Sequence, residues 1–433
     1  MDRVAMRRVG PATPMGRMMR EYWIPASLSS ELVAGGAPVR LLLMGEKLLG
    51  FRDGAGRVGV MDHRCPHRGT SLFYGRNEKD GLRCAYHGWK FDVEGHCLDQ
   101  PNVVDRDKTL DTTPARAYKA ADRNGLIWVY MGGRAVPPPL PEFGPMQFPG
   151  DQLVIAASLA RCNWLQALEG AIDNSHTGFL HRTDLENRLK RSGDSPDTEL
   201  LRYFLACLNP EIESLDSDWG TMYGNKRPAR PGAAYWRVGH FIFPFWSVPT
   251  PGPFGRDVQM LGWIPMDDTH TFHISLRWTG NDSGPRAQES AIIETLPNTT
   301  DWLGRWIPAA NNENDYAMDR AAQLRGDSFT GIQRIPNQDR MAYESMGEMC
   351  DYDAEHLKSS DLMISRTRRR VFAAAEAYER DGTLPPGVDD PSVCKGARGG
   401  DYLAREHLNF IDSYREQMRR IEASEGKNPV TTT

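Results

Sequence analysis

Three patterns of hydrophobic and polar residues follow one another along the chain. Residues 39–63 predict short strands joined by turns, with a hairpin at Asp53–Gly56. Between residues 233 and 280, apolar side chains alternate with polar ones, which is typical of antiparallel strands in a half-buried sheet. The last third has the period of amphipathic helices, predicted over residues 314–324, 340–346, 360–378 and 402–423. The chain is therefore predicted to have an α+β fold.

Two domains are predicted from these patterns. Thr13 and Pro14 suit the N-cap and the first turn of a short helix, and the strands that follow continue to about Gly133. The proline-rich residues 135–145 then form a stiff connector. We place an all-β domain with a short N-terminal helix at residues 1–140. Residues 141–433 are predicted to form a second domain, with a central antiparallel sheet flanked by helices.

Composition and charge narrow the class of protein. Of the 433 residues, 40% are hydrophobic and 25% charged, as in ordinary soluble globular proteins. The formal net charge of −5 argues against general binding to nucleic acid or anionic membranes. No apolar run approaches the length of a membrane span, and Met1–Gly10 lacks the apolar core of a signal peptide. Seven cysteines, an odd number, do not suggest a disulfide framework. A reduced, cytoplasmic protein is expected.

Two matched cysteine–histidine pairs carry the strongest chemical signal. Cys65–Pro66–His67 is followed after sixteen residues by Cys84–Ala85–Tyr86–His87. Two thiolates that hold one iron and two imidazoles that hold the other are the ligands of a Rieske [2Fe–2S] centre. The alternative is a Cys2His2 zinc site, although zinc sites usually group like ligands as CxxC and HxxxH. Nearby glycines would let backbone amides approach sulfur, and Trp89 would shield a cluster from water.

A second motif lies in the apolar, Trp-led residues 163–181. It carries Asp173, His176 and His181, and Glu169 precedes them by one turn. On a helix, Asp173 and His176 would lie on one face, and Gly178 would bend the chain so that His181 returns toward His176. Two imidazoles and one distant carboxylate form the facial triad of non-haem Fe(II) oxygenases. The alternative is that both histidines are structural.

With both motifs present, the sequence resembles the large (alpha) subunits of the Rieske non-haem iron aromatic-ring-hydroxylating oxygenases. Within that family it is most similar to the phthalate dioxygenase branch, and the resemblance runs over most of the chain. The branch is indicated by TPMGRMMREYWIP (13–25), NDYAMDRAAQ (314–323), TGIQRIPNQD (330–339) and YESMG (343–347).

The resemblance implies a Rieske [2Fe–2S] cluster and a mononuclear Fe(II). In the family, the carboxylate ligand of the mononuclear iron follows the histidine pair by well over a hundred residues and lies on a helix. Asp339 matches that place, and Glu344 on the same predicted helix is the alternative. The cluster ligands would be Cys65, His67, Cys84 and His87, and the iron ligands His176, His181 and Asp339.

Two acidic residues beside the histidine pair receive catalytic roles from the resemblance. The family passes electrons from the cluster of one subunit to the iron of its neighbour, and a carboxylate bridges a histidine of each site. By position Asp173 is that bridge, between His87 of one chain and His176 of the next. Glu169 projects toward the same side and would tune the site. A buried helix carboxylate with a backbone donor is the alternative for Asp173.

The implied activity is O2-dependent hydroxylation of a small aromatic acid of the phthalate or benzoate type. O-demethylation of a methoxylated aromatic acid fits the same machinery, and a Rieske electron-transfer protein without chemistry of its own is a further alternative. Arg237 and Arg227 are candidate ligands of a substrate carboxylate. Phe243, with its neighbours Phe241, Phe245 and Trp246, would line an aromatic cavity or pack in the sheet core.

The resemblance also implies the partners. A homotrimer, with some members stacked into hexamers, is expected. The electron donor would be a separate flavin and [2Fe–2S] reductase that draws on NADH. The arginines of 366–370 form either a solvated face or a docking site for an acidic donor.

Overall fold

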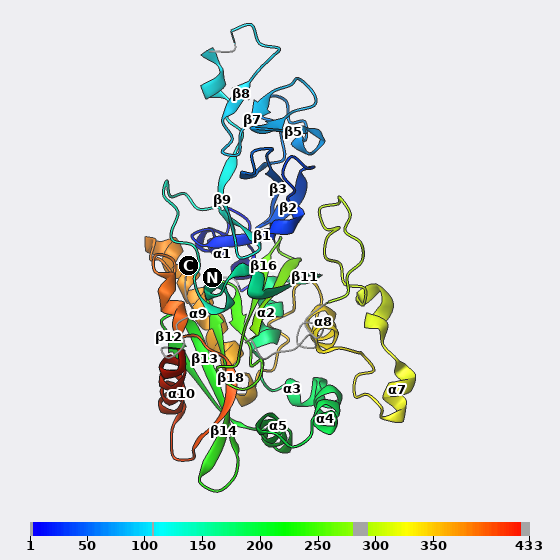
Figure 1. The fold of residues 1–433 in the computed structure, drawn as a ribbon, viewed down its shortest axis with the longest axis vertical. Helices are drawn as coiled ribbons and strands as arrows, with labels where there is room; N and C mark the ends of the chain where they lie inside the picture. Colours follow the sequence, from blue (N-terminus) through cyan, green and yellow to red (C-terminus); the bar gives the residue numbers. More distant parts are fainter. Residues whose placement is uncertain (1–2, 106–107, 280–292, 426–433) are drawn as a thin grey trace.

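The N-terminal part of the chain forms two small sheets, and the C-terminal part is built on one large sheet (Figure 1). The computed structural model describes residues 3–105, 108–279 and 293–425 of the 433. The α+β fold with an all-β N-terminal part is confirmed.

A six-stranded antiparallel sheet forms the base of the N-terminal part, in the order β1-β10-β9-β4-β3-β2. Its strands are β1 (Trp23–Leu28), β2 (Val39–Leu43), β3 (Glu46–Arg52), β4 (Val58–Asp62), β9 (Ala117–Arg123) and β10 (Leu126–Tyr130). The predicted hairpin joins β3 to β4. Asp53 Oδ1 accepts hydrogen bonds from the backbone of Ala55 and Arg57, at 3.0 and 2.8 Å, and so fixes the turn.

A four-stranded sheet rises from this base and forms one end of the molecule (Figure 1). Its strands are β5 (Arg76–Glu78), β6 (Gly81–Arg83), β7 (Lys90–Phe91) and β8 (Cys97–Asp99). Its hydrophobic cluster around Leu82 and Phe91 continues into the base sheet through Leu49, Phe51 and Met61. Such short strands depend on this cluster and on ion pairs, such as the pair between Arg83 and Glu78 at 2.9 Å.

The large sheet of the C-terminal part has the order β11-β17-β16-β15-β14-β13-β12, and an additional strand, β18, pairs with β14. The strands are β11 (Leu153–Ala160), β12 (Glu211–Ser217), β13 (Gly220–Pro228), β14 (Ala233–Ile242), β15 (Trp246–Val248), β16 (Asp257–Pro265), β17 (Thr271–Thr279) and β18 (Gly400–Arg405). The helix predicted over 402–423 is therefore wrong in its first part, which pairs as β18, and the helix begins only at Phe410.

Helices cover the large sheet and connect it to the N-terminal part. They are α1 (Pro14–Met19), α2 (Trp164–Ile172), α3 (Thr177–Leu180), α4 (Arg182–Arg191), α5 (Pro196–Ala206), α7 (Arg320–Arg325), α8 (Ile335–Ser345), α9 (Leu362–Asp381) and α10 (Phe410–Glu425). Short 3-10 helices are η1 (Ala5–Arg7), η2 (Ser29–Glu31), η3 (Leu72–Tyr74), η5 (Leu110–Thr112), η6 (Gly144–Gln147), η7 (Gly150–Gln152), η8 (Asn312–Ala317), η9 (Ser359–Asp361) and η10 (Pro391–Gly396).

Two helix predictions show how local backbone chemistry decides the outcome. Thr13 Oγ1 accepts a hydrogen bond from Gly16 N at 3.1 Å, so α1 begins where its N-cap predicts. The helix predicted over 314–324 is instead divided into η8 and α7. Tyr316 and Ala317 have positive φ angles of 55° and 53°, which a continuous right-handed helix does not allow.

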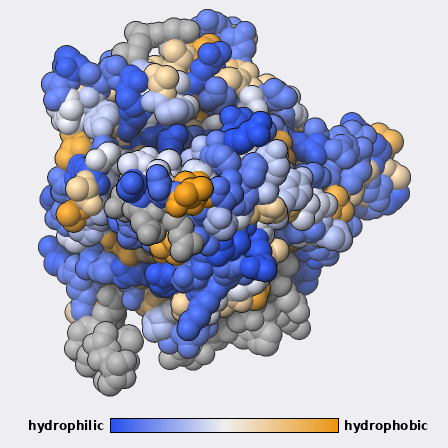
Figure 2. All heavy atoms as spheres, turned by 90° about the horizontal axis from the view of Figure 1, so that it is seen from above, coloured by the Kyte–Doolittle hydropathy of each residue, from blue (hydrophilic) through white to orange (hydrophobic). Residues whose placement is uncertain are grey.

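The two parts share one hydrophobic core. Trp128 of β10 and Trp246 of β15 lie 6.1 Å apart between ring centroids, and α1 packs against α9. Seen from the end that carries β5–β8, the surface is mainly hydrophilic, and its hydrophobic side chains form small separate groups (Figure 2). Among the described helices, none combines the length and the apolar character that a membrane crossing requires.

Candidate metal centres

The two cysteine–histidine loops at the end of the N-terminal part have the same backbone hydrogen bonds. The carbonyl of Cys65 accepts from Gly69 N at 2.8 Å, and that of Cys84 accepts from Gly88 N at 3.1 Å. In both loops the cysteine N–H donates to the carbonyl of the residue after that glycine, at 2.8 Å. Both glycines have φ of +76°, a left-handed conformation that side chains other than glycine rarely adopt. The sequence pattern therefore encodes two equivalent loops.

The side chains of these loops separate into a buried thiol pair and an outer imidazole pair. Cys65 and Cys84 are 2% and 3% exposed. The rings of His67 and His87 lie 4.5 Å apart, and Trp89 stacks on His67 at 4.5 Å. Burial and the adjacent Cys84 thiol raise the pKa of Cys65 to about 11. Cluster binding would replace those thiol protons with iron.

The spacing of these four side chains fits a two-iron cluster better than a single zinc ion. Ligands of one tetrahedral zinc lie roughly 3–4 Å from one another, given zinc–ligand bonds of about 2.0–2.3 Å. Within 3–105, 108–279 and 293–425, the group of metal-binding side chains whose ligand atoms all lie within 4.8 Å of one another is His176, His181 and Asp339. The ligand atoms of Cys65, His67, Cys84 and His87 therefore do not all lie within 4.8 Å of one another. This wider spacing is expected when two ligands bind each of two irons.

The second motif folds as a turn between two helices. Asn163 caps α2, which ends at Ile172, and α3 begins only at Thr177. Asp173 Oδ1 accepts from the backbone N and the hydroxyl of Ser175, at 2.7 and 2.9 Å. The prediction that Asp173 and His176 share a helix face is wrong, because the polar run Asp173–Ser175 hydrogen-bonds its own backbone and ends α2.

Both histidines of this turn meet Asp339 of α8. The Nε2 atoms of His176 and His181 lie 3.5 and 3.0 Å from Asp339 Oδ1, and the two rings are nearly perpendicular, 5.1 Å apart. The predicted bend at Gly178 is wrong, because Gly178 lies inside α3 (Thr177–Leu180), and one helical turn carries the chain from His176 to His181. Two nitrogens and one carboxylate oxygen on one side of a turn have the composition of a facial triad.

Each histidine is also held by its other ring nitrogen. His176 Nδ1 lies 3.5 Å from Asp173 Oδ2, and His181 Nδ1 lies 2.7 Å from Gln338 Oε1. Both Nε2 atoms are thereby directed toward Asp339. Sequence reasoning misses Gln338, although a polar residue directly before a predicted metal ligand is a candidate partner of the other ligands.

The charges of the site favour a bound cation. Burial alone would lower the pKa of His176, but the carboxylates of Asp173 and Asp339 raise it to about 10. Burial would raise the pKa of Asp339, but the two histidines hold it well below its usual range. In the metal-free protein, a proton on His176 thus balances the carboxylates. The donor set, its burial and its charge fit a divalent metal ion.

Loading the metal-free protein with Fe(II) at pH 7 is expected to release about one proton per site, because a histidine must be neutral to bind a metal and His176 has a pKa of about 10. The release should disappear above pH 10, where His176 is already neutral. Calorimetric titration in buffers of different ionisation enthalpy measures the number. Metal binding without proton release at pH 7 would contradict this charge state.

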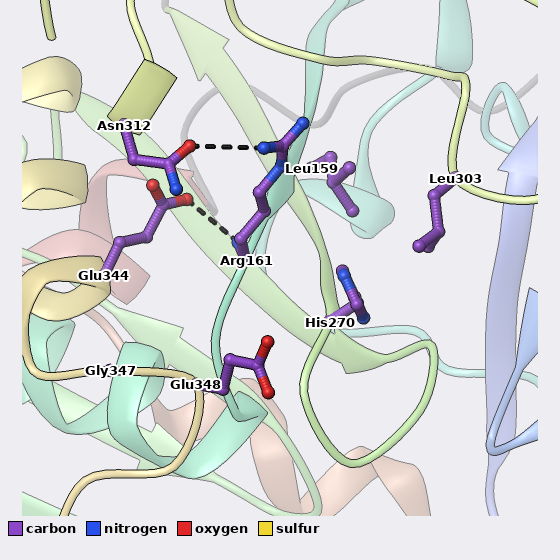
Figure 3. A pocket seen from close by; sticks show the side chains of 8 residues that line it. All are labelled: Leu159, Arg161, His270, Leu303, Asn312, Glu344, Gly347 and Glu348. Carbon is purple, nitrogen blue, oxygen red and sulfur yellow. Dashed lines mark hydrogen bonds between the residues drawn. The ribbon is translucent and has the colours of Figure 1, made fainter. Parts of the chain in front are cut away.

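Glu344, the alternative carboxylate, lines a cleft of about 400 Å³ (Figure 3) and is not in the group formed by His176, His181 and Asp339. Its Oε1 accepts from Arg161 N at 2.9 Å, and its Oε2 accepts from Tyr316 OH at 2.8 Å. Figure 3 shows it beside Arg161 and Asn312, on the side of α8 that faces this cleft. The geometry brings Asp339 to the histidine pair and gives Glu344 other partners.

The carboxylate of Glu169 is likewise engaged elsewhere. Each of its two oxygens accepts a hydrogen bond from Arg368 at 2.8 Å. The hydroxyl of Tyr352 lies 3.1 Å from both oxygens. This buried ion pair ties α2 to α9, and the predicted tuning of the site by Glu169 stays a prediction. The arginine run is also not a free cationic face. Arg370 donates to the carbonyls of Gly220 and Ser217, and Arg369 is the exposed member among the four arginines.

The candidate substrate residues have different surroundings. Arg237 of β14 lies 3.9 Å from Asp401, and its side chain is 18% exposed. Arg227 of β13 donates to the carbonyl of Cys207 at 2.8 Å. Phe243 is buried in the core, 5.1 Å from the ring of Phe241. This placement favours a packing role for Phe243 over the predicted contact with substrate.

Comparisons with known proteins cover nearly the whole chain. Two family models match, the Rieske [2Fe-2S] domain over residues 22–114 and the LigXa C-terminal domain-like family over residues 129–397. The 3-chlorobenzoate-3,4-dioxygenase oxygenase subunit of Comamonas testosteroni is 42% identical over 97% of this chain and 98% of its own length. The phthalate 4,5-dioxygenase oxygenase subunit of Pseudomonas putida is 34% identical over 87% of this chain and 86% of its own. Among solved structures, dicamba monooxygenase bound to dicamba is similar in fold, with a TM-score of 0.55 and 18% identity over 83% of this chain and 98% of that chain.

Proposed function

The chain belongs to the Rieske-type oxygenases, as an oxygenase subunit with a LigXa-like C-terminal domain, and from this we propose that it hydroxylates a small aromatic carboxylate with O2. The observation that carries the proposal is the convergence of His176, His181 and Asp339 within 4.8 Å in a chain that also has a Rieske domain. An electron-transfer protein without its own chemistry has no use for such a site.

The proposal gives each group a task. Cys65, His67, Cys84 and His87 would hold the [2Fe–2S] cluster, and His176, His181 and Asp339 would hold a ferrous ion. When bound, the cluster supplies single electrons and the ferrous ion activates O2. The chain itself excludes water from the buried thiols, directs two Nε2 atoms toward one carboxylate, and keeps Asp173 against His176.

The two centres of one chain are proposed to work with those of other copies. Strands β5–β8 and helix α3 lie in opposite halves of the molecule (Figure 1), which supports electron transfer between subunits. Asp173 keeps a side chain that is 22% exposed, so a neighbouring chain can reach it. We assign it the bridge between His176 and His87 of the partner subunit, in a homotrimer or a stacked hexamer. The electron donor is proposed to be a flavin and [2Fe–2S] reductase that uses NADH.

The substrate carboxylate is proposed to contact Arg237. Arg237 and Asn225 are paired across β13 and β14, so their side chains lie on the same sheet face as Tyr223, two residues earlier. Tyr223 in turn lies close enough to Asn174 and Asp173 for them to affect its pKa. These relations support the proposal that the Arg237 guanidinium lies on the sheet face nearest the candidate iron site. The relatives from Comamonas testosteroni and Pseudomonas putida are called 3-chlorobenzoate and phthalate dioxygenase subunits, and both names denote aromatic carboxylates.

Replacing Arg237 with methionine is expected to raise KM for an aromatic carboxylate by roughly 10–100-fold, since a hydrogen bond to a charged group contributes about 1.5–3 kcal/mol. KM for the matching methyl ester should change little. Arg230→Met, at an exposed arginine paired with Glu199, is the control. Equal changes for acid and ester would remove Arg237 from the substrate site.

Aerobic turnover with a surrogate reductase and NADH tests the proposed function. The panel would contain phthalates, other benzoates and methoxybenzoates, with product mass and formaldehyde recorded. A diol carrying both atoms of labelled O2 identifies a ring dioxygenase, and formaldehyde with a phenol identifies an O-demethylase. A preparation with the cluster but without mononuclear iron, and without any product, would support the electron-transfer alternative.

A further inference from the structure

Gln338 connects one of the candidate iron ligands to a half-buried carboxylate. It lies in α8, next to Asp339, and is 1% exposed. Its Oε1 lies 2.7 Å from His181 Nδ1. Its Nε2 lies 2.7 Å from Asp184 Oδ2 on α4 and 2.8 Å from the carbonyl of Ile332. All polar atoms of this amide therefore have partners.

These partners fix which way the amide faces. The NH2 group has two protons, and a carboxylate and a backbone carbonyl, both acceptors, stand where those protons point. Turning the amide over would place its oxygen against two acceptors at 2.7–2.8 Å. The oxygen of Gln338 must therefore face His181. Since that oxygen only accepts, His181 Nδ1 must carry a proton and donate it.

The state of Nδ1 decides the state of Nε2. Because Nδ1 keeps its proton, Nε2 is the nitrogen that can give up a proton and bind a metal, and it lies 3.0 Å from Asp339 Oδ1. His181 is 3% exposed, so water does not compete for either nitrogen. The chain Asp184–Gln338–His181 thus orients the ring and leaves Nε2 as the nitrogen that binds a metal.

We propose that Gln338, held by Asp184, is a positioning residue that keeps His181 in the Nδ1–H tautomer and so prepares Nε2 to bind the mononuclear metal. This deepens the proposed function and rests on it. The two histidines differ in this respect. His176 has a carboxylate, Asp173, at its Nδ1, and that carboxylate is also assigned to the bridge between subunits. The partner of His181 is the amide of Gln338, to which no role between subunits is assigned.

Co(II) binding to the full-length protein with its cluster loaded tests this assignment. Gln338→Leu keeps the approximate size of the side chain but removes the acceptor, and the Kd for Co(II) is expected to rise by roughly 10–100-fold. Asp184→Asn keeps an acceptor for Gln338 Nε2, so its Kd should stay within a few-fold of wild type. Gln323→Leu makes the same exchange on the exposed helix α7 and should leave the Kd unchanged.

A spectroscopic measurement separates positioning from a merely structural link between α4 and α8. In the Co(II) protein, an imidazole bound through Nε2 gives a hyperfine-shifted proton resonance from its Nδ1–H. The resonance of His181 should persist in water in wild type and in Asp184→Asn, and should broaden by exchange in Gln338→Leu. Unchanged thermal unfolding of metal-free Gln338→Leu would show that the fold is intact.

The outcomes separate this inference from the proposed function. If folded Gln338→Leu has the same Kd for Co(II) and the same Nδ1–H resonance as wild type, the role of Gln338 is overturned and the proposed function is not. Equal losses in Gln338→Leu and Asp184→Asn, with the resonance retained in both, also overturn it, because they indicate a structural link. Absence of Co(II) binding at the His176–His181–Asp339 site in wild type overturns both.

Discussion

Replacing Asp339 with asparagine is expected to weaken metal binding at the His176–His181 site by more than about 100-fold, beyond the 10–100-fold typical of groups that only orient a ligand. Asp339 supplies the anionic donor, and its Oδ1 is the atom that both Nε2 atoms face, at 3.5 and 3.0 Å. Product formation should stop, while the spectrum of the Rieske cluster should remain. Iron analysis and cluster absorbance measure the two sites separately.

The matched control is Glu344→Gln, the same exchange of carboxylate for amide on the same helix. Glu344 binds Arg161 N and Tyr316 OH beside the cleft, so the mononuclear metal should be retained. Loss of metal in Glu344→Gln together with its retention in Asp339→Asn would reverse the assignment of the carboxylate ligand.

The second large effect is expected from Asp173→Asn. Ser175 donates two hydrogen bonds to Asp173 Oδ1, so the oxygen of the new amide would stay there and its NH2 would face His176 Nδ1. Two donors would then oppose each other at the proposed bridge. Both metals should remain bound, but turnover should fall by roughly 100-fold or more, a size typical of lost orienting carboxylates. Stopped-flow reoxidation of the reduced cluster with substrate and O2 would show the same loss.

A mixed oligomer makes this prediction specific to a bridge between subunits. Chains with Asp173→Asn lack a working bridge and chains with Cys84→Ser lack a cluster, so each is expected to be inactive alone. Co-expressed in one oligomer, the first chain still offers its cluster to the intact bridge and iron site of the second. Activity in the mixed oligomer and none in either parent is expected. Equal inactivity of all three would contradict transfer between subunits.

The cluster loops and the large sheet follow from local sequence. The cysteine–histidine spacing with Gly69 and Gly88 leads to two loops with the same hydrogen bonds, because the left-handed turn needs glycine at that place. The strands β14 to β17 follow from an alternation of period two. Such signals are carried within about ten residues, so sequence reasoning finds them.

The features that sequence reasoning missed depend on long-range contacts. Tyr402 begins a segment with a helical pattern, yet it pairs with Trp236 of β14 across the sheet, an edge that the local pattern does not reveal. The partner of Glu169 is Arg368 on α9, and the partner of His181 is Gln338 on α8. Each pair is separated by more than 150 residues, and only tertiary packing decides which polar side chain meets which.

The central claim, that this chain itself oxygenates an aromatic acid, is tested most directly by a single turnover. The protein with both metals loaded would be reduced chemically, freed of reductant, and exposed to labelled O2 with each acid of the panel. We expect a product that carries the label, in an amount that depends on mononuclear iron and is lost in Asp339→Asn. Reoxidation of the cluster with every acid recovered unchanged would contradict the claim.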